Sequence, residues 1–125
     1  MEQAGLSPVE PVISDGEDRV SQGRNASRQM ADSGAGFDGL FFACDAMALG
    51  ALEELASLGI AVPDQVGVIG FDGLGSGEFS APPLTTVQPD FAQAGMTLVD
   101  TALASGEDRP ERRVKVHLVE RASVR

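Results

Sequence analysis

An aspartate follows directly after a short apolar run in this chain, and its carboxylate is the first group with recognisable chemistry. Residues 66–71 read Val-Gly-Val-Ile-Gly-Phe, and Asp72 comes next. An ionised carboxylate can accept strong hydrogen bonds from two hydroxyl groups, as binding of a sugar or another polyol requires. Asp72 is therefore our first candidate for ligand contact. The same residue type also opens turns, and the sequence Asp-Gly-Leu-Gly that begins here fits that role equally well.

A second apolar run, residues 39–43, is followed by Cys44 and Asp45. In open parallel sheets, ligands bind beyond the carboxyl ends of the strands, where loops converge and helix N-termini present N–H donors. Cys44, Asp45 and Asp72 are all expected at that edge. Asp45 directly precedes a helical pattern, so we interpret it as a helix cap and leave it out of the predicted site.

Other reactive residue types lack the partners that catalysis or metal binding requires. His117 is the only histidine, and neither a second histidine nor a cysteine stands at a metal-ligand spacing from it. There is no Gly-x-Ser-x-Gly elbow, and the single histidine supports neither a Ser-His-Asp nor a Cys-His arrangement. The glycines of residues 70–77 are not followed by Gly-Lys-Ser/Thr, so they do not form a P-loop. We expect a protein without enzymatic activity, metal or cofactor.

The elements that would position Asp72 form a strand, helix and strand in succession. Residues 39–43 form a continuous apolar run, typical of a strand covered on both faces in a parallel sheet. Residues 46–58 follow helical spacing and end before Gly59, and residues 66–71 read as a second buried strand. Because such a βαβ unit pairs its strands in parallel, the predicted fold class is α/β, a parallel sheet with flanking helices.

Weaker patterns predict the remaining elements. A polar helix over residues 20–32 is expected to be buried through Val20, Ala26 and Met30, and an alternating strand over residues 113–120 to be half-exposed. The other expected elements are a helix end at Gly5, an edge strand over residues 9–13, a short strand over residues 84–87, and a helix over residues 90–105 in which Gln93 completes a capping box and Gly106 is the stop.

Composition limits the classes of partner and compartment. The 125 residues are about one domain in size, and the net charge of −10 opposes binding to nucleic acid by this chain itself. Cys44 is the only cysteine and cannot form an internal disulfide. Neither a secretory leader pattern nor an apolar run long enough to span a bilayer occurs. We expect a cytoplasmic protein that does not enter a membrane.

Several ordered motifs resemble those of the LacI/GalR family of transcriptional regulators. Residues 41–95 contain, in order, Asp-x-Met-Ala-x-Gly, a Val-Pro linker, Gly-Phe-Asp and Pro-Pro-Leu-Thr-Thr-Val. The ending Leu-Val-Glu-Arg-Ala-Ser resembles the family's closing strand. The resemblance implies an incomplete lobe of the periplasmic-binding-protein-like type I fold. It implies that residues 1–125 are the C-terminal portion of an effector-binding domain, with the helix-turn-helix, the first lobe and the opening strand and helix of the second lobe absent.

The same resemblance implies roles for particular residues. Asp72 would hold effector hydroxyl groups, and Phe91 matches a position that often packs on the ligand. Cys44 stands where the family often has Asn, and Asp18 stands where it often has a stacking aromatic residue. A thiol is a poor hydrogen-bonding group, so Cys44 is expected to weaken binding of a hydroxyl at that position. These departures point to an atypical effector or to lost binding.

The resemblance also implies partners. The expected effector is a small sugar or related polyol, and operator DNA would be bound only through a helix-turn-helix that this chain lacks. The helix over residues 45–58 and the loop over residues 79–83 correspond to surfaces that pair two subunits in the family, which implies a homodimer.

Two other functions are compatible with the same fold class. One is an extracytoplasmic sugar-binding protein, which a secretory leader upstream of Met1 would favour. The other is a flavodoxin-like enzyme or phospho-acceptor domain that uses Asp72. That second function needs an acidic cluster for Mg²⁺ and a nearby lysine, and Lys115 is the only lysine in the chain.

Overall fold

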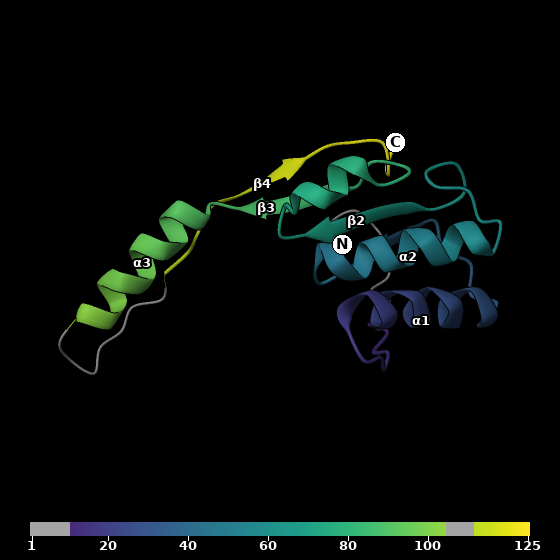
Figure 1. Cartoon of the computed structure of the whole chain (residues 1–125), viewed down its shortest axis with the longest axis horizontal. Helices are drawn as coiled ribbons and strands as arrows, with labels where there is room; N and C mark the ends of the chain where they lie inside the picture. Colours follow the sequence, from purple (N-terminus) through teal and green to yellow (C-terminus); the bar gives the residue numbers. More distant parts are fainter. Residues whose placement is uncertain (1–10, 105–111) are drawn as a thin grey trace.

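The computed structural model describes residues 11–104 and 112–125, in which two α-helices lie on one face of a four-stranded sheet and a third extends away from it (Figure 1). The predicted helix end at Gly5, the first residues of the predicted edge strand and the stop at Gly106 lie outside the described residues. In chain order the elements are α1 (Arg19–Asp32), β1 (Gly39–Phe41), α2 (Asp45–Ser57), β2 (Gly67–Phe71), the 3-10 helix η2 (Gly75–Phe79), β3 (Thr85–Pro89), α3 (Phe91–Leu103) and β4 (Val116–Val119).

The sheet has the order β1-β2-β3-β4. β1, β2 and β3 are parallel, which confirms the predicted βαβ unit around α2. The sheet is nevertheless mixed, because β4 pairs with β3 in the antiparallel direction. The reason is that the chain returns from α3 beside the carboxyl end of β3, where the Asp90 N–H donates to the Lys115 carbonyl at 2.9 Å. β4 therefore leads away from the point at which β3 ends.

The hydrophobic core lies between α2 and the sheet. Ala48, Ala51, Leu52 and Leu55 recur at helical spacing on α2 and are at most 4% exposed. They pack in one cluster with sheet residues such as Val68, which alternates along β2 with residues facing the other side. The helix ends at Ser57 with Leu58 as its C-cap residue, and Gly59 follows with φ +73°, a left-handed conformation that glycine adopts without a steric penalty.

Glycines bring α1 and α2 into close contact. A Cβ added at Gly23 would lie 1.9 Å from the Met47 carbonyl oxygen, and one at Gly50 would lie 2.1 Å from the Val20 carbonyl oxygen. The two helix backbones therefore touch at each of these glycines. The prediction that Val20 and Met30 bury α1 was wrong. Val20 is 37% exposed and Met30 is half-buried, whereas Gly23, Ala26 and Ser27 are the buried residues of the helix.

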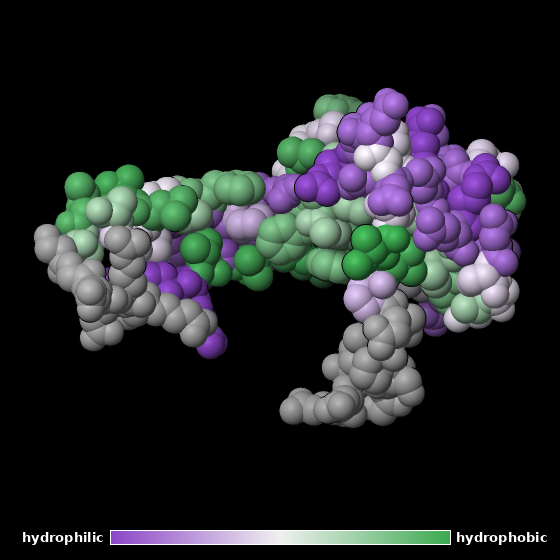
Figure 2. Space-filling model, turned by 90° about the horizontal axis from the view of Figure 1, so that it is seen from below, coloured by the Kyte–Doolittle hydropathy of each residue, from purple (hydrophilic) through white to green (hydrophobic). Residues whose placement is uncertain are grey.

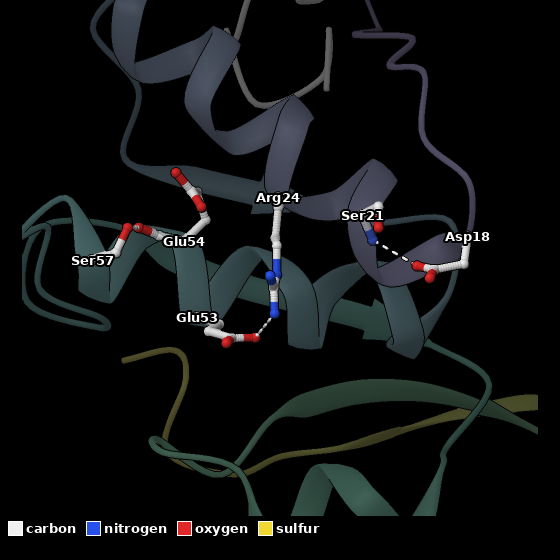
Figure 3. A network of polar contacts seen from close by, with 6 residues as sticks. All are labelled: Asp18, Ser21, Arg24, Glu53, Glu54 and Ser57. Atoms are coloured by element: carbon white, nitrogen blue, oxygen red, sulfur yellow. Dashed lines mark hydrogen bonds and ion pairs between the residues drawn. The ribbon is translucent and has the colours of Figure 1, made fainter.

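Two ion pairs join the same helices, and Figure 3 shows the one between Arg24 and Glu53. Arg24 Nη2 lies 2.5 Å from Glu53 Oε2, and Arg28, one turn further along α1, pairs with Glu54, the residue after Glu53. α1 and α2 run in the same direction and begin at the same end of the molecule (Figure 1). The Arg24–Glu53 pair is exposed and adds little stability. In the second pair the Glu54 side chain is only 13% exposed. The glycine contact, rather than the ion pairs, is the main determinant of this packing.

The second face of the sheet carries no covering layer among the described residues. Phe41 on β1 is 64% exposed, which contradicts the prediction of a strand covered on both faces. Val116 and Leu118 on β4 are also more than half exposed. Residues 11–13 are exposed and form no strand, so the predicted edge strand was wrong there. A parallel sheet normally has helices on both faces, and here only α1 and α2 form such a layer.

α3 extends away from the sheet as an arm (Figure 1), and none of its residues is buried. Figure 2 shows hydrophobic side chains along this arm. Its exposed apolar residues include Met96, Leu98, Val99 and Leu103. No helix in the described part of the chain is long and apolar enough to cross a membrane.

Candidate functional site

The parallel strands bring three of the predicted site residues to one edge of the sheet. Cys44 follows β1, Asp72 follows β2, and Phe91 begins α3 immediately after β3 and Asp90. Asp18 caps α1, and it lies at the same end of the molecule because α1 begins beside the start of α2. This edge is the candidate site.

Asp72 has a strained backbone. Its φ is +118°, a region that residues with a side chain seldom adopt, and Gly73 follows with φ +74°. A Cβ at Gly73 would lie 2.5 Å from Gln88 Cγ, so only glycine fits beside that side chain. The Asp72 side chain is half-buried, and its backbone N–H donates to the Val87 carbonyl at 3.0 Å.

A buried carboxylate holds the turn that contains Asp72. Asp45 Oδ2 accepts a hydrogen bond from the Leu74 N–H at 2.6 Å, and Asp45 Oδ1 accepts one from the Thr86 hydroxyl at 2.5 Å. Thr86 Oγ1 in turn accepts from the Gly73 N–H at 3.2 Å. The Asp45 and Thr86 side chains are completely buried. Gly70 on β2 leaves room for this carboxylate, since a Cβ there would lie 2.1 Å from Asp45 Oδ1.

This geometry corrects the interpretation of Asp45 as a helix cap. Cys44 is the N-cap residue of α2, and its side chain makes no capping hydrogen bond. Asp45 is the first residue of the helix and turns its carboxylate toward the loop after β2. Sequence reasoning missed this because an aspartate before a helical run carries the same signal in both roles. Thr86 was missed as well, since a threonine in a strand carries no signal of its own.

Asp18 uses its carboxylate to cap α1 (Figure 3). The Ser21 N–H donates to Asp18 Oδ1 at 2.8 Å. Hydrogen bonds from the backbone and hydroxyl of Ser21 lower the pKa of Asp18 below its usual value, because they stabilise the ionised form. The carboxylate is fully exposed, and its described hydrogen bond is to its own helix.

Phe91 is 58% exposed at the start of α3, with its ring available to a ligand or to another surface. Asp90 caps this helix by accepting from the Gln93 N–H at 2.9 Å. The predicted capping box is incomplete, because Gln93 Oε1 accepts from the Lys115 N–H at 2.8 Å instead of reaching back to Asp90. Gln93 thus joins α3 to the chain that enters β4.

The two hollows described on the surface lie away from Asp72. One, of about 300 Å³, lies at the C-terminal half of α2, where Leu52 and Ala56 face Ala81 and Pro82. The other, of about 270 Å³, lies on the uncovered sheet face and includes Phe41 and Ile69. The candidate site is therefore an open edge, one wall of a site rather than an enclosed pocket. Among residues 11–104 and 112–125, no group of three metal-ligating side chains gathers.

Comparisons with known proteins fit this architecture. A family model described as "Periplasmic binding protein-like domain" matches residues 1–124. The transcriptional repressor MelR of Bacillus subtilis is 33% identical over 82% of this chain, a match that spans 29% of MelR. The repressor PurR of Proteus mirabilis is 30% identical over 99% of this chain, a match that spans 38% of PurR. The chain thus spans well under half the length of these curated relatives.

Solved structures give the same result. A sugar-binding transcriptional regulator of the LacI family from Escherichia coli, complexed with phosphate, superposes with a TM-score of 0.80 at 28% identity, covering 98% of this chain and 45% of that one. The CelR–cellobiose complex superposes with a TM-score of 0.81 at 30% identity, covering 98% of this chain and 38% of that one.

Proposed function

The chain belongs to the periplasmic-binding-protein-like domain family of LacI/GalR-type transcriptional regulators, and we propose that residues 1–125 are the C-terminal portion of the effector-binding domain of such a regulator. The observation that carries this proposal is the placement of Asp72. Its carboxylate stands beyond the carboxyl end of β2, where ligands bind in open α/β sheets, on a strained backbone that the surrounding hydrogen bonds hold.

The proposed effector is a small carbohydrate or related polyol. Asp72 would accept hydrogen bonds from its hydroxyl groups, and Phe91 would pack against a face of the ring. Cys44 at the N-terminus of α2 would contribute a weakly polar contact. Asp18 would border the site, with its carboxylate engaged by Ser21. One structural relative has been solved with cellobiose, which supports this class of ligand.

The proposed role is that of a sensor rather than an enzyme. Effector binding would change the conformation of the complete regulator and so its affinity for operator DNA, which a separate helix-turn-helix would bind. A regulator of transcription acts in the cytoplasm, where we place this one. The regulators among its relatives favour this function over sugar uptake and over a flavodoxin-like enzyme or phospho-acceptor.

We further propose that the chain forms a homodimer through the C-terminal half of α2 and the loop over residues 79–83. The hollow between Ala56 and Pro82 is lined by apolar residues, and Phe79, two residues before Ala81 in the same loop, is 86% exposed. A two-fold pairing would cover this apolar surface with the same surface of a second copy.

The substitution Asp72→Asn in the complete regulator tests the site. Asparagine tolerates a positive φ but loses the charge that strengthens hydrogen bonds to hydroxyl groups. We expect affinity for a carbohydrate effector to fall by about ten- to a hundredfold, as loss of a charge-assisted hydrogen bond predicts, with operator binding unchanged. Titration calorimetry with cellobiose as the first probe measures this effect.

The matched control is Asp38→Asn, which removes an exposed carboxylate at the opposite end of the strands, just before β1. This variant should bind the effector as the unmodified protein does. Equal effector affinity of the Asp72→Asn variant and the unmodified regulator contradicts the proposed role of Asp72.

A further inference from the structure

We propose that Asp45 and Thr86 form a buried positioning pair that holds Asp72 in its left-handed conformation and thereby sets the direction in which the Asp72 carboxylate points. This inference rests on the proposed function, because it assigns to the pair the geometry of an effector contact. The pair touches the turn rather than the effector.

The turn is fixed at three successive backbone N–H groups. The Asp72 N–H donates to the Val87 carbonyl, the Gly73 N–H to Thr86 Oγ1, and the Leu74 N–H to Asp45 Oδ2. A residue with φ +118° keeps that conformation only where its surroundings hold it. Two of the three hydrogen bonds come from the Asp45–Thr86 pair. The pair therefore restrains the backbone at both residues that follow Asp72, Gly73 and Leu74.

The pair is well suited to this role because its own geometry has little freedom. Thr86 Oγ1 donates to Asp45 Oδ1 and accepts from Gly73, so its hydroxyl hydrogen has one direction. The Asp45 carboxylate is completely buried, and a buried charge is tolerated only when hydrogen bonds satisfy it. It also stands in the first turn of α2, where the helix dipole favours a negative charge.

The backbone of β2 leaves space for the Asp45 carboxylate at Gly70. Gly70 lies on β2 directly under the carboxylate, where any Cβ would come within 2.1 Å of Asp45 Oδ1. The strand thus leaves room for the carboxylate at the position from which it reaches Leu74. The register of β2 and β3, which pairs Gly70 with Thr86, brings the hydroxyl to the same point.

Thr85 provides a matched control for Thr86. Both side chains are completely buried on β3. The Thr85 hydroxyl accepts from the Arg121 N–H at 2.8 Å, which ties it to the C-terminal segment and not to the turn. Replacing either threonine with valine removes one buried hydroxyl and keeps the side-chain shape. Only Thr86→Val removes a partner of Gly73 and of Asp45.

The first experiment measures amide hydrogen exchange by NMR on the whole chain without effector, for the unmodified protein and for the Thr86→Val, Thr86→Ser and Thr85→Val variants. In Thr86→Val we expect exchange of the Gly73 and Leu74 amides to rise roughly tenfold relative to a core amide such as that of Val68, with a changed Cα shift at Asp72. Thr86→Ser restores the hydroxyl and should restore both readouts. Thr85→Val should leave them unchanged.

Unchanged exchange at Gly73 and Leu74 in Thr86→Val, or the same increase in Thr85→Val, overturns the proposal. If Thr86→Val does not fold, Asp45→Asn provides the second variant. It keeps the side-chain volume but turns one acceptor into a donor, and it should increase exchange of the Leu74 amide.

The second experiment measures cellobiose affinity for the same variants and for Asp72→Asn. We expect Thr86→Val to lose about tenfold in affinity and Asp72→Asn about ten- to a hundredfold, whereas Thr86→Ser and Thr85→Val bind as the unmodified chain does. Absence of binding by the unmodified chain, or undiminished binding by Asp72→Asn, counts against the proposed function alone, since the exchange experiment still decides the role of the pair. Undiminished binding by Thr86→Val, when Asp72→Asn binds weakly, overturns the positioning role.

Discussion

At the residue scale, the candidate site depends on the Asp72 carboxylate and on the buried Asp45 and Thr86 side chains that hold its turn. Asp72 could be identified because an aspartate after a buried strand lies at the edge where ligands bind. The role of Asp45 could not be predicted, because its partners Leu74 and Thr86 lie far from it in the sequence and no sequence pattern identifies them. The positive φ of Asp72 was equally hidden, since only the hydrogen bonds of the folded turn make it tolerable.

Asp18 permits a prediction about pH. Its pKa is lowered in the folded protein, chiefly by the hydrogen bond from the Ser21 backbone, so the ionised form contributes stability above the unfolded pKa. That contribution is lost as the pH falls through the folded pKa. In Asp18→Asn the cap persists, because asparagine is also a good N-cap residue, but the charge is gone.

We therefore expect Asp18→Asn to be slightly less stable than the unmodified chain at neutral pH, and this difference to disappear in strongly acidic buffer. Urea unfolding of both proteins at the two pH values measures it. Asp38→Asn, at an exposed carboxylate outside any helix cap, provides the control for a general change in charge. A difference that stays the same at both pH values contradicts the prediction.

At the element scale, the βαβ unit was predictable because its signals are local. Apolar runs, helical spacing and a glycine stop each lie within one segment, and β1, α2 and β2 appear where these signals stand. The direction of β4 was not predictable, because its alternation does not encode which strand it joins. For the same reason Gln93 fitted a capping box by spacing but bonds to Lys115 in the structure.

Gly23 shows how packing reverses a local expectation. Glycine inside a helix normally costs about 1 kcal/mol relative to alanine. At Gly23, however, a Cβ would collide with the Met47 carbonyl of the neighbouring helix. We expect Gly23→Ala to destabilise the chain by about 1 to 3 kcal/mol through overpacking, measured as a lower midpoint of urea unfolding.

Gly95→Ala is the matched control for this prediction. Gly95 lies inside α3, and a Cβ there would meet nothing within 4 Å. The helix propensity of alanine should therefore stabilise α3 by up to about 1 kcal/mol. If both substitutions shift the midpoint in the same direction, close contact between α1 and α2 does not determine the effect at Gly23.

At the scale of the whole molecule, the sequence indicated the fold class and the layer formed by α2 against the sheet. It did not indicate that apolar residues of the second sheet face and of α3 would stand exposed. An apolar run predicts a covered strand or helix because apolar residues are usually buried. The run itself does not indicate which other segment covers it. The same ambiguity applies to the surface around Phe79.

Self-association could use either the apolar surface around Phe79 or that of α3, and substitutions distinguish the two. We expect Phe79→Ser to raise the dissociation constant of the dimer about tenfold or more, because an aromatic side chain at the centre of an interface contributes much of its free energy. Leu98→Ser on α3 removes an apolar side chain that is 71% exposed, outside the proposed interface, and should leave the dissociation constant unchanged. Analytical ultracentrifugation over a range of concentrations measures both.

Salt provides an independent check of the same prediction. Each chain carries a net charge of −10, so two copies repel one another at low ionic strength, and an apolar interface should strengthen as salt screens that repulsion. A dimer that weakens with added salt depends on charge pairs instead. If Leu98→Ser disrupts association and Phe79→Ser does not, α3 rather than the loop over residues 79–83 provides the interface, because the substitution that matters must lie where the two copies meet.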